Sequence, residues 1–220
     1  MNVGDPKAKA VFKEEIAKRL ASGYQPVIEY LFEQKYLNYL SSEELLFSLL
    51  VPKEAEVLLK LEQKYGVIFK FKPNSMSSPL FSKHHELLRP NVRTFSIMSK
   101  HVTYLNLKRC GFLKIPNSLS TLTHLEELIF IMDNINEIPE SFRNLIQLKR
   151  LSLNRCGLNE LPKGLENIKS LEELSLTGNN ISDISEIKLP KNIKKIDLRK
   201  NPVTDVDFRK VLPNIEIKYS

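Results

Sequence analysis

The chain has 220 residues, a formal net charge of +7, a hydrophobic fraction of 42% and two cysteines. The hydrophobic fraction is typical of a protein with a globular core. No stretch approaches the roughly 18 apolar residues of a membrane span. Two cysteines are too few for a disulfide scaffold. Because the first residues also lack a secretion signal, we expect a soluble cytoplasmic protein, whose positive charge permits an acidic protein, a nucleic acid or an anionic membrane surface as partner.

The first part of the chain has a helical pattern. Apolar residues recur at helical spacing over residues 7–22 and 26–40. Ser41 and Glu44 have the spacing of a capping box, which predicts a third helix to residue 50. A proline and a glycine then bound a predicted fourth helix over residues 53–65. We expect these helices to form a cap that docks on the residues that follow, and an independent helical domain on a linker is the alternative.

Two short strands are expected next. Residues 67–71 (Val-Ile-Phe-Lys-Phe) predict one strand, and the serine-rich residues 72–90 predict a loop. Residues 92–97 alternate like a strand, and a short turn over 98–101 would fold it back on the following segment as a capping hairpin. The predicted organisation is a helical region at 1–66, a strand and loop linker at 67–91 and a third domain at 92–220.

That third domain is built from a repeated unit. Copies begin at residues 102, 125, 148, 171 and 193, in steps of 23, 23, 23 and 22. The first reads Val-x-x-Leu-x-Leu-x-x-Cys-x-Phe-x-x-Ile-Pro-x-x-Leu-x-x-Leu, and the others place similar residues at the same offsets. Five copies in register at a fixed period indicate a stacked repeat architecture.

Each offset has a physical reason. The x-Leu-x-Leu-x segment alternates with period two, which predicts a strand with one buried face. The Asn or Cys that follows marks a turn, where a buried Asn can bond unpaired backbone groups. Pro116, Pro139 and Pro162 suit the first turn of a short helical return segment. Because no copy can bury its own apolar face, stacking should make one core, with five side chains facing inwards in neighbouring strands: Leu105, Leu128, Leu151, Leu174 and Ile196.

The end of the chain and the two cysteines complete this picture. A helix over residues 205–212 and a sixth strand over 215–217 are predicted to cap the stack. Cys110 and Cys156 lie two repeats apart, which corresponds to about 10 Å at the usual strand spacing. A disulfide needs Cα atoms within about 7 Å. We therefore expect two buried thiols.

These motifs resemble leucine-rich repeats of the intracellular 23-residue class, through their Ile/Leu-Pro-x-x-Leu-x-x-Leu second half. Ras-suppressor-type scaffolds and the repeats of Roco GTPases are similar. The resemblance covers residues 92–217 and implies an α/β leucine-rich-repeat solenoid, a curved parallel sheet with a short helical outer layer, here preceded by a helical cap. Three features depart from the pattern. Asp133 replaces the Asn of the turn, and Ser185 replaces the proline of the fourth copy. Copies four and five look more like repeats of a 22-residue type. The resemblance implies partner binding and names no partner.

The sequence gives no positive support for catalysis or for a cofactor. The seven glycines are scattered singly, so a phosphate-cradling loop is not predicted. Neither cysteine pairs nor a His-x-x-x-His spacing suggest zinc, and no motif surrounds a serine as a catalytic triad would need. The His84-His85-Glu86 segment could bind a stray metal ion, but a solvated loop is the favoured interpretation. We therefore expect a protein that is not an enzyme and holds no metal.

The outward-facing residues of the strands are expected to form a concave binding face. Acidic and basic residues alternate from strand to strand at its start, which predicts an internal ladder of ion pairs. Ile129 and Ile131 flank the inward-facing Phe130 and are expected to be exposed, a common mark of an interface. The alternative is that the N-terminal segment or residues 72–90 cover them. The predicted partner-binding residues are Tyr104, Lys108, Arg109, Ile129, Ile131, Met132, Asn154, Arg155, Thr177 and Arg199.

The leading functional hypothesis is a monomeric adaptor or scaffold that binds a protein, for example a small GTPase or another signalling protein, through this face. The alternative is binding of RNA or a ribonucleoprotein by the basic C-terminal end. Residues 188–220 hold nine Lys and Arg against four Asp and Glu, and such charge attracts phosphates. That end lacks aromatic stacking platforms, which argues against single-stranded nucleic acid.

Overall fold

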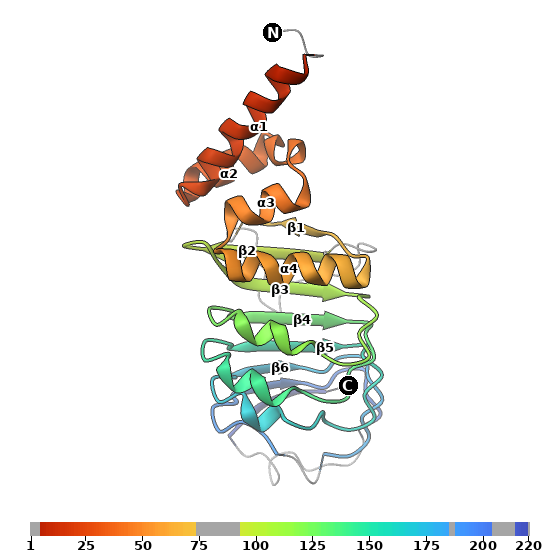
Figure 1. Cartoon of the computed structure of the whole chain (residues 1–220). Helices are drawn as coiled ribbons and strands as arrows, with labels where there is room; N and C mark the ends of the chain where they lie inside the picture. Colours follow the sequence, from red (N-terminus) through yellow and green to blue (C-terminus); the bar gives the residue numbers. More distant parts are fainter. Residues whose placement is uncertain (1–4, 74–92, 185–187, 204–213, 220) are drawn as a thin grey trace.

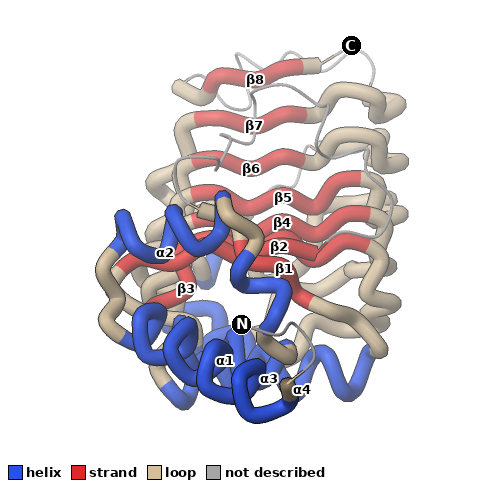
Figure 2. Tube along the Cα trace, turned by 90° about the horizontal axis from the view of Figure 1, so that it is seen from above, coloured by secondary structure: helices blue, strands red, loops and turns tan. Residues whose placement is uncertain are grey.

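A computed structural model describes residues 5–73, 93–184, 188–203 and 214–219. An eight-stranded sheet runs through the molecule, and its strands lie side by side in the order of the chain. The helices α1–α4 gather at the end of the stack where the chain begins, and β8 lies at the far end (Figures 1 and 2). Within the described residues, no helix is long and apolar enough to cross a membrane.

The N-terminal region is helical, as the sequence predicts. The capping box is confirmed, since the Ser41 hydroxyl accepts a hydrogen bond from the Glu44 N–H, and Gly66 ends the fourth helix with a positive φ of 61°. The single helix expected over residues 26–40 is wrong, because Lys35 takes a left-handed conformation and breaks it into an α-helix and a 3-10 helix. The elements are α1 (Pro6–Ala21), α2 (Gln25–Glu33), η1 (Tyr36–Tyr39), α3 (Ser42–Leu49) and α4 (Pro52–Tyr65).

The sheet opens with a short parallel pair and a hairpin. β1 (Phe69–Phe71) is shorter than the expected strand and pairs in parallel with β2 (Arg93–Met98), so the predicted linker contributes the first strand of the sheet. β2 pairs antiparallel with β3 (His101–Lys108) around a turn in which Ser99 and Lys100 have positive φ. The predicted capping hairpin is therefore confirmed.

The remaining strands pair in parallel with the predicted register. Leu105 lies beside Leu128, and the same row continues through Leu151, Leu174 and Ile196, all buried. This confirms that segments one repeat apart lie side by side and share one core. The strands are β4 (Glu127–Ile131), β5 (Arg150–Asn154), β6 (Glu173–Ser175), β7 (Lys195–Asp197) and β8 (Glu216–Lys218).

Short helices form the outer layer of the repeats. Pro116 and Pro139 immediately precede the first two of them rather than lying in the first turn, and Pro162 lies three residues before the third. They are 3-10 helices of three to five residues: η4 (Asn117–Thr121), η5 (Glu140–Asn144) and η6 (Leu165–Asn167). The predicted sixth strand is present as β8. Ser185, the predicted helix at 205–212 and most of the predicted loop at 72–90 lie outside the described residues.

The helical region and the repeats share one hydrophobic core. Buried side chains form a continuous cluster from Ile16 in α1 to Leu198 in the last repeat. The rings of Tyr65 in α4 and Phe112 in the first repeat meet edge to face at 4.6 Å. The backbone N–H of Val51 also donates to the carbonyl of Lys100 at 3.0 Å. The helices thus cap the apolar end of the stack, which an uncapped solenoid would leave in water.

Candidate functional site

The concave face begins with the predicted ladder of ion pairs. The Arg150 guanidinium lies 3.0 Å from the Glu127 carboxylate on the neighbouring strand, and further along Lys195 pairs with Glu216 at 2.9 Å. Burial raises the pKa of Glu127, although the charge and hydrogen bond of Arg150 act in the opposite direction. These charges are therefore paired across the sheet, although one oxygen of Glu127 is buried without a hydrogen-bond partner among the described residues.

The expectation that Ile129 and Ile131 are exposed is wrong. They do lie on the side of the sheet away from the main core, where they form a separate apolar cluster with Tyr104, packed against Met132. Their side chains are nevertheless only 3% and 5% exposed. Alternation along a strand shows which face a side chain is on, but clustered apolar groups on that face still gain free energy by leaving water. The alternative that residues 72–90 cover this cluster falls mostly outside the described residues.

The accessible predicted residues lie at or just beyond the carboxyl ends of the strands. Arg109 and Arg155 are exposed, whereas Tyr104 and Lys108 are buried with the two isoleucines. The other four predicted residues are half-buried: Met132, Asn154, Thr177 and Arg199.

One residue per repeat turns the chain with a positive φ at this edge. Arg109, Met132, Arg155 and Lys200 occupy equivalent positions with φ between 51° and 59°, and Gly178 takes the same place in the fourth repeat. Non-glycine residues rarely adopt this conformation. A Cβ on Gly178 would lie 3.0 Å from Cγ of Arg155, so the arginine stem packs closely over the glycine. The turn geometry therefore places these side chains in one row.

Hydrogen bonds hold the polar residues of the row in place. The Asn154 side-chain oxygen accepts from the Ser175 hydroxyl at 2.8 Å and from the Thr177 N–H at 2.9 Å. Arg199 donates to both oxygens of Asp197. Burial acts to raise the pKa of Asp197, but the hydrogen bonds and charge of Arg199 outweigh it and hold the pKa below its ordinary value.

Three positively charged side chains lie beside the apolar residues. Burial lowers the pKa of Lys108, and the charges of Arg109 and Arg155 lower it further. Nε of Arg109 lies 3.1 Å from the sulfur of Met132. The structure thus brings Lys108, Arg109 and Arg155 together around Met132, and we name these three cations the basic cluster.

Three expectations for the residues at the turn after each strand are confirmed. The side-chain oxygen of Asn179 accepts from two backbone N–H groups, and its amide donates to two carbonyls. Cys110 and Cys156 are buried free thiols, as predicted. Burial raises their pKa values to about 11 and about 12. Asp133 forms a different bond pattern from Asn179, as its departure from the repeat suggests.

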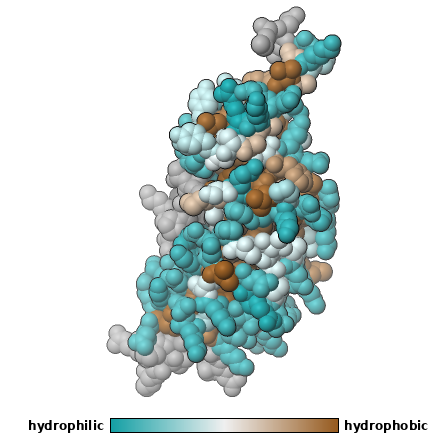
Figure 3. All heavy atoms as spheres, turned by 60° about the vertical axis from the view of Figure 1, so that its left-hand side comes forward, coloured by the Kyte–Doolittle hydropathy of each residue, from teal (hydrophilic) through white to brown (hydrophobic). Residues whose placement is uncertain are grey.

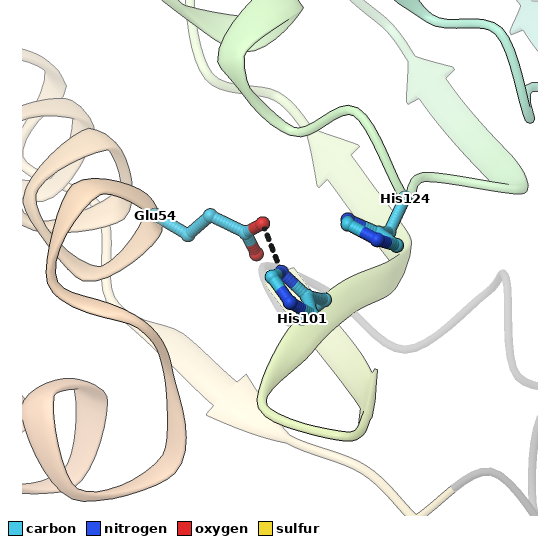
Figure 4. Close-up of side chains that lie close together, drawn as sticks. All are labelled: Glu54, His101 and His124. Atoms are coloured by element: carbon cyan, nitrogen blue, oxygen red, sulfur yellow. Dashed lines mark hydrogen bonds and ion pairs between the residues drawn. The ribbon is translucent and has the colours of Figure 1, made fainter.

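Sequence reasoning missed one cluster of polar side chains. Glu54, His101 and His124 meet at the joint between α4 and the first repeat (Figure 4). Nδ1 of His101 lies 2.8 Å from a Glu54 oxygen, and the two imidazole rings stack with centroids 3.8 Å apart. No local spacing motif links the three residues. The signal was the repeat itself, because His101 and His124 are 23 residues apart and so occupy equivalent positions in adjacent turns.

Exposed apolar residues outside the helical region are dispersed, whereas exposed Phe12 and Tyr39 meet edge to face at 5.2 Å within it. Leu113, Ile146 and Ile68 are each more than 60% exposed but lie in separate connecting segments. Figure 3 shows a side of the molecule that is mainly hydrophilic with small hydrophobic spots. Recognition by the described surface therefore depends more on charge and hydrogen bonding than on a broad apolar patch.

A family model described as leucine-rich repeat region matches residues 95–206. Among solved structures, a leucine-rich-repeat protein of Leptospira interrogans is 27% identical over 58% of this chain, with a TM-score of 0.41. Internalin C2 of Listeria monocytogenes is 24% identical over 52% of this chain, with a TM-score of 0.40. The chain covers 31% and 51% of the lengths of these two structures. The leucine-rich-repeat domain of the type III effector XopL is 17% identical over 100% of this chain and 73% of its own, with a TM-score of 0.45. No curated protein matches the chain.

Proposed function

The chain belongs to the leucine-rich-repeat family, and on this premise we propose that it is a protein-binding adaptor which holds its partner at the carboxyl-end edge of the concave face. Leucine-rich-repeat solenoids generally serve protein–protein interaction. The proposal extends to a non-enzymatic, monomeric, cytoplasmic scaffold of the intracellular 23-residue class. A small GTPase or another signalling protein is the partner class that the resemblance to Ras-suppressor-type repeats suggests.

The basic cluster is the observation that carries the proposal. Lys108 and Arg109 lie at the end of β3 and Arg155 follows β5, close enough for the two arginines to lower the pKa of Lys108. Like charges that lie close together repel each other, and carboxylates on a partner would be attracted to the two exposed arginines. We therefore propose that the partner presents carboxylates to Arg109 and Arg155, which are exposed.

The surroundings of the cluster suit recognition. Asn154, Ser175 and Thr177 are already joined by hydrogen bonds, so little ordering is needed when a partner binds. Met132 offers a half-buried apolar contact beside the arginines. An apolar centre with a charged rim is the usual anatomy of a protein interface.

The nucleic-acid alternative has less support. Lys194, Lys195 and Arg199, three of the basic residues counted for it, are engaged by Glu172, Glu216 and Asp197 within the sheet. Residues 204–213 lie outside the described residues. The test must therefore distinguish binding of a nucleic acid from binding of a protein partner.

The test is capture of partners by the immobilised full chain from a lysate that has been treated with nuclease. The variant Arg109→Glu/Arg155→Glu reverses both exposed charges of the basic cluster. We expect it to lose the captured protein, because a buried charge contact that is reversed costs about 2–5 kcal/mol or more of binding free energy. Quantitative mass spectrometry of the captured proteins is the measurement.

The matched control is Lys163→Glu/Lys169→Glu, which makes the same charge change at exposed residues in the return segments. Circular dichroism should show that both variants keep the fold. Equal loss of the protein in both variants would point to net charge alone, and its retention by the arginine variant would refute the proposed site. Capture that depends on omitting the nuclease would favour nucleic acid.

A further inference from the structure

Three side chains with metal-ligating atoms converge from separate segments of the chain (Figure 4). Glu54 lies in the first turn of α4, His101 begins β3, and His124 lies just before β4. One candidate ligand atom from each residue lies within 4.8 Å of the other two. We propose that Glu54, His101 and His124 form a binding site for a divalent transition-metal ion such as Zn²⁺, at the joint between the helical cap and the first repeat.

An unused nitrogen supports the proposal. Nδ1 of His124 is buried and has no hydrogen-bond partner among the described residues. A buried polar atom without a partner normally costs free energy, and such atoms in a native structure call for an explanation. A metal ion that accepts this lone pair would supply one.

The carboxylate is held in place from two sides. One oxygen of Glu54 accepts the N–H of Val102 at 2.7 Å, and the other lies 2.8 Å from Nδ1 of His101. The side chain is only 4% exposed. A carboxylate in this position can bind the ion directly or orient the histidine that does, and both arrangements are common in zinc sites.

A cavity lies beside two of the three side chains, Glu54 and His101; Lys53 also lines it, whereas His124 does not. A cavity of about 460 Å³ is lined by Glu54 and His101, together with the hydroxyl-bearing Ser120, Thr121 and Thr123. Two nitrogens and a carboxylate leave the fourth position of a tetrahedral zinc site for a water molecule. The cavity gives that water access to solvent.

Binding requires a change in the two rings. An imidazole binds a metal through a lone pair in the plane of its ring, and the rings of His101 and His124 are stacked with an interplanar angle of 22°. The rings must therefore turn apart before both nitrogens face one ion. We expect zinc to open the stack and to link α4 to the first repeat.

The cysteines do not compete as ligands near neutral pH. The thiolate is the form that binds metals, and burial raises the pKa of Cys110 to about 11 and that of Cys156 to about 12. Both thiols therefore stay protonated in the folded protein. Cobalt substitution should accordingly show coordination by nitrogen and oxygen without a thiolate charge-transfer band.

The experiment is a calorimetric titration of the full, metal-free chain with zinc chloride near pH 7.5, in a buffer that does not bind zinc. We expect one ion per chain in the wild type. His124→Gln should weaken binding by at least about tenfold, because even the loss of a supporting residue costs about 10- to 100-fold in metal affinity. Zinc should also raise the melting temperature of the wild type but not that of the variant.

The control is His84→Gln/His85→Gln, which alters the other two histidines of the chain. Because neither residue is one of the three proposed ligands, the zinc affinity of this variant should equal that of the wild type. Loss of binding in this control, or unchanged binding in His124→Gln, would place the ion elsewhere. Absence of binding to the folded wild type at millimolar zinc would show that the cluster is only a hydrogen-bonded joint.

Discussion

The carboxylate of Asp133 occupies the turn position that Asn179 and Asn201 fill in later repeats. Asn179 uses its oxygen for the N–H groups of Cys156 and Leu158 and its amide for two carbonyls. One oxygen of Asp133 accepts the Phe112 N–H, but the other is buried without a hydrogen-bond partner among the described residues. A carboxylate cannot donate to carbonyls as the amide does.

Asp133→Asn should therefore stabilise the protein. At pH 7 we expect the free energy of unfolding to rise by about 1–3 kcal/mol, the usual cost of an unsatisfied buried group. Burial raises the pKa of Asp133 in the folded state, so the folded state binds the proton more tightly than the unfolded one. The wild type therefore regains stability as the pH falls through that raised pKa towards the ordinary value of about 3.9.

Urea unfolding of both proteins at pH 7 and at mildly acidic pH is the measurement. The advantage of Asp133→Asn should shrink as the pH falls. A variant less stable than the wild type at pH 7 would show that the aspartate carries a favourable interaction which the amide cannot replace.

Sequence reasoning at the residue scale was accurate for the direction of side chains and less so for their burial. The inward leucines and the pairing of Glu127 with Arg150 follow from alternation and the 23-residue step, and both are confirmed. The burial of Ile129 and Ile131 could not follow, because it depends on atoms outside the strand that carries them. The histidine cluster was missed because Glu54 comes from a helix 47 residues before His101.

At the scale of elements, the return segment of the third repeat depends on Gly164. This residue precedes η6 with a φ of 89°, and an added Cβ would collide with the carbonyl oxygen of Ile138 in the preceding turn. The neighbouring backbone is fixed there, because the Ile138 N–H donates to the Lys163 carbonyl at 2.8 Å. The second and third repeats are therefore closely joined at this point.

Gly164→Ala should destabilise the protein more than Gly111→Ala. Gly111 also has a positive φ, of 71°, but no atom lies within 4 Å of the place where its Cβ would be. The Gly111 variant should lose about 1–2 kcal/mol from its left-handed conformation alone. The Gly164 variant should lose more, since the backbone must also shift. Chemical unfolding of both variants measures the two losses of unfolding free energy. Equal losses would mean that the backbone around Gly164 can shift without a cost in free energy.

Element boundaries were the weaker part of the sequence prediction. The helix expected over residues 26–40 has continuous apolar spacing, yet it breaks at Lys35, a residue without the conformational signature of glycine. The strand near residue 69 was expected in a linker, and its place in the sheet depends on pairing with β2, more than twenty residues later. Local patterns predict the type of an element better than its end or its partner.

On the scale of the whole molecule, the continuous core couples the helical cap to the repeats. Leu58 in α4 is fully buried within the cluster that extends to the last repeat. Leu58→Ala should lower the free energy of unfolding by about 2–5 kcal/mol. Because the cluster is shared, we expect the cap and the repeats to unfold together.

Two probes report separately on the two regions. Circular dichroism follows the α-helices, and alkylation of Cys156, located by mass spectrometry, follows the third repeat. The raised pKa of Cys156, about 12, and its burial make it unreactive until the repeats open. Both probes should shift to lower urea together in Leu58→Ala. Loss of helix while Cys156 stays protected would identify the helical region as an independent domain.

The hairpin of β2 and β3 also limits how such a molecule can change in length. Equivalent turns of parallel strands can be added to or removed from a stack without altering the geometry of those that remain. β2 runs against β3, so another copy placed before β3 would meet a neighbour of the wrong direction. Whole repeats can therefore be gained or lost only after β3 in the chain, and the hairpin fixes the end of the stack at which the parallel strands begin.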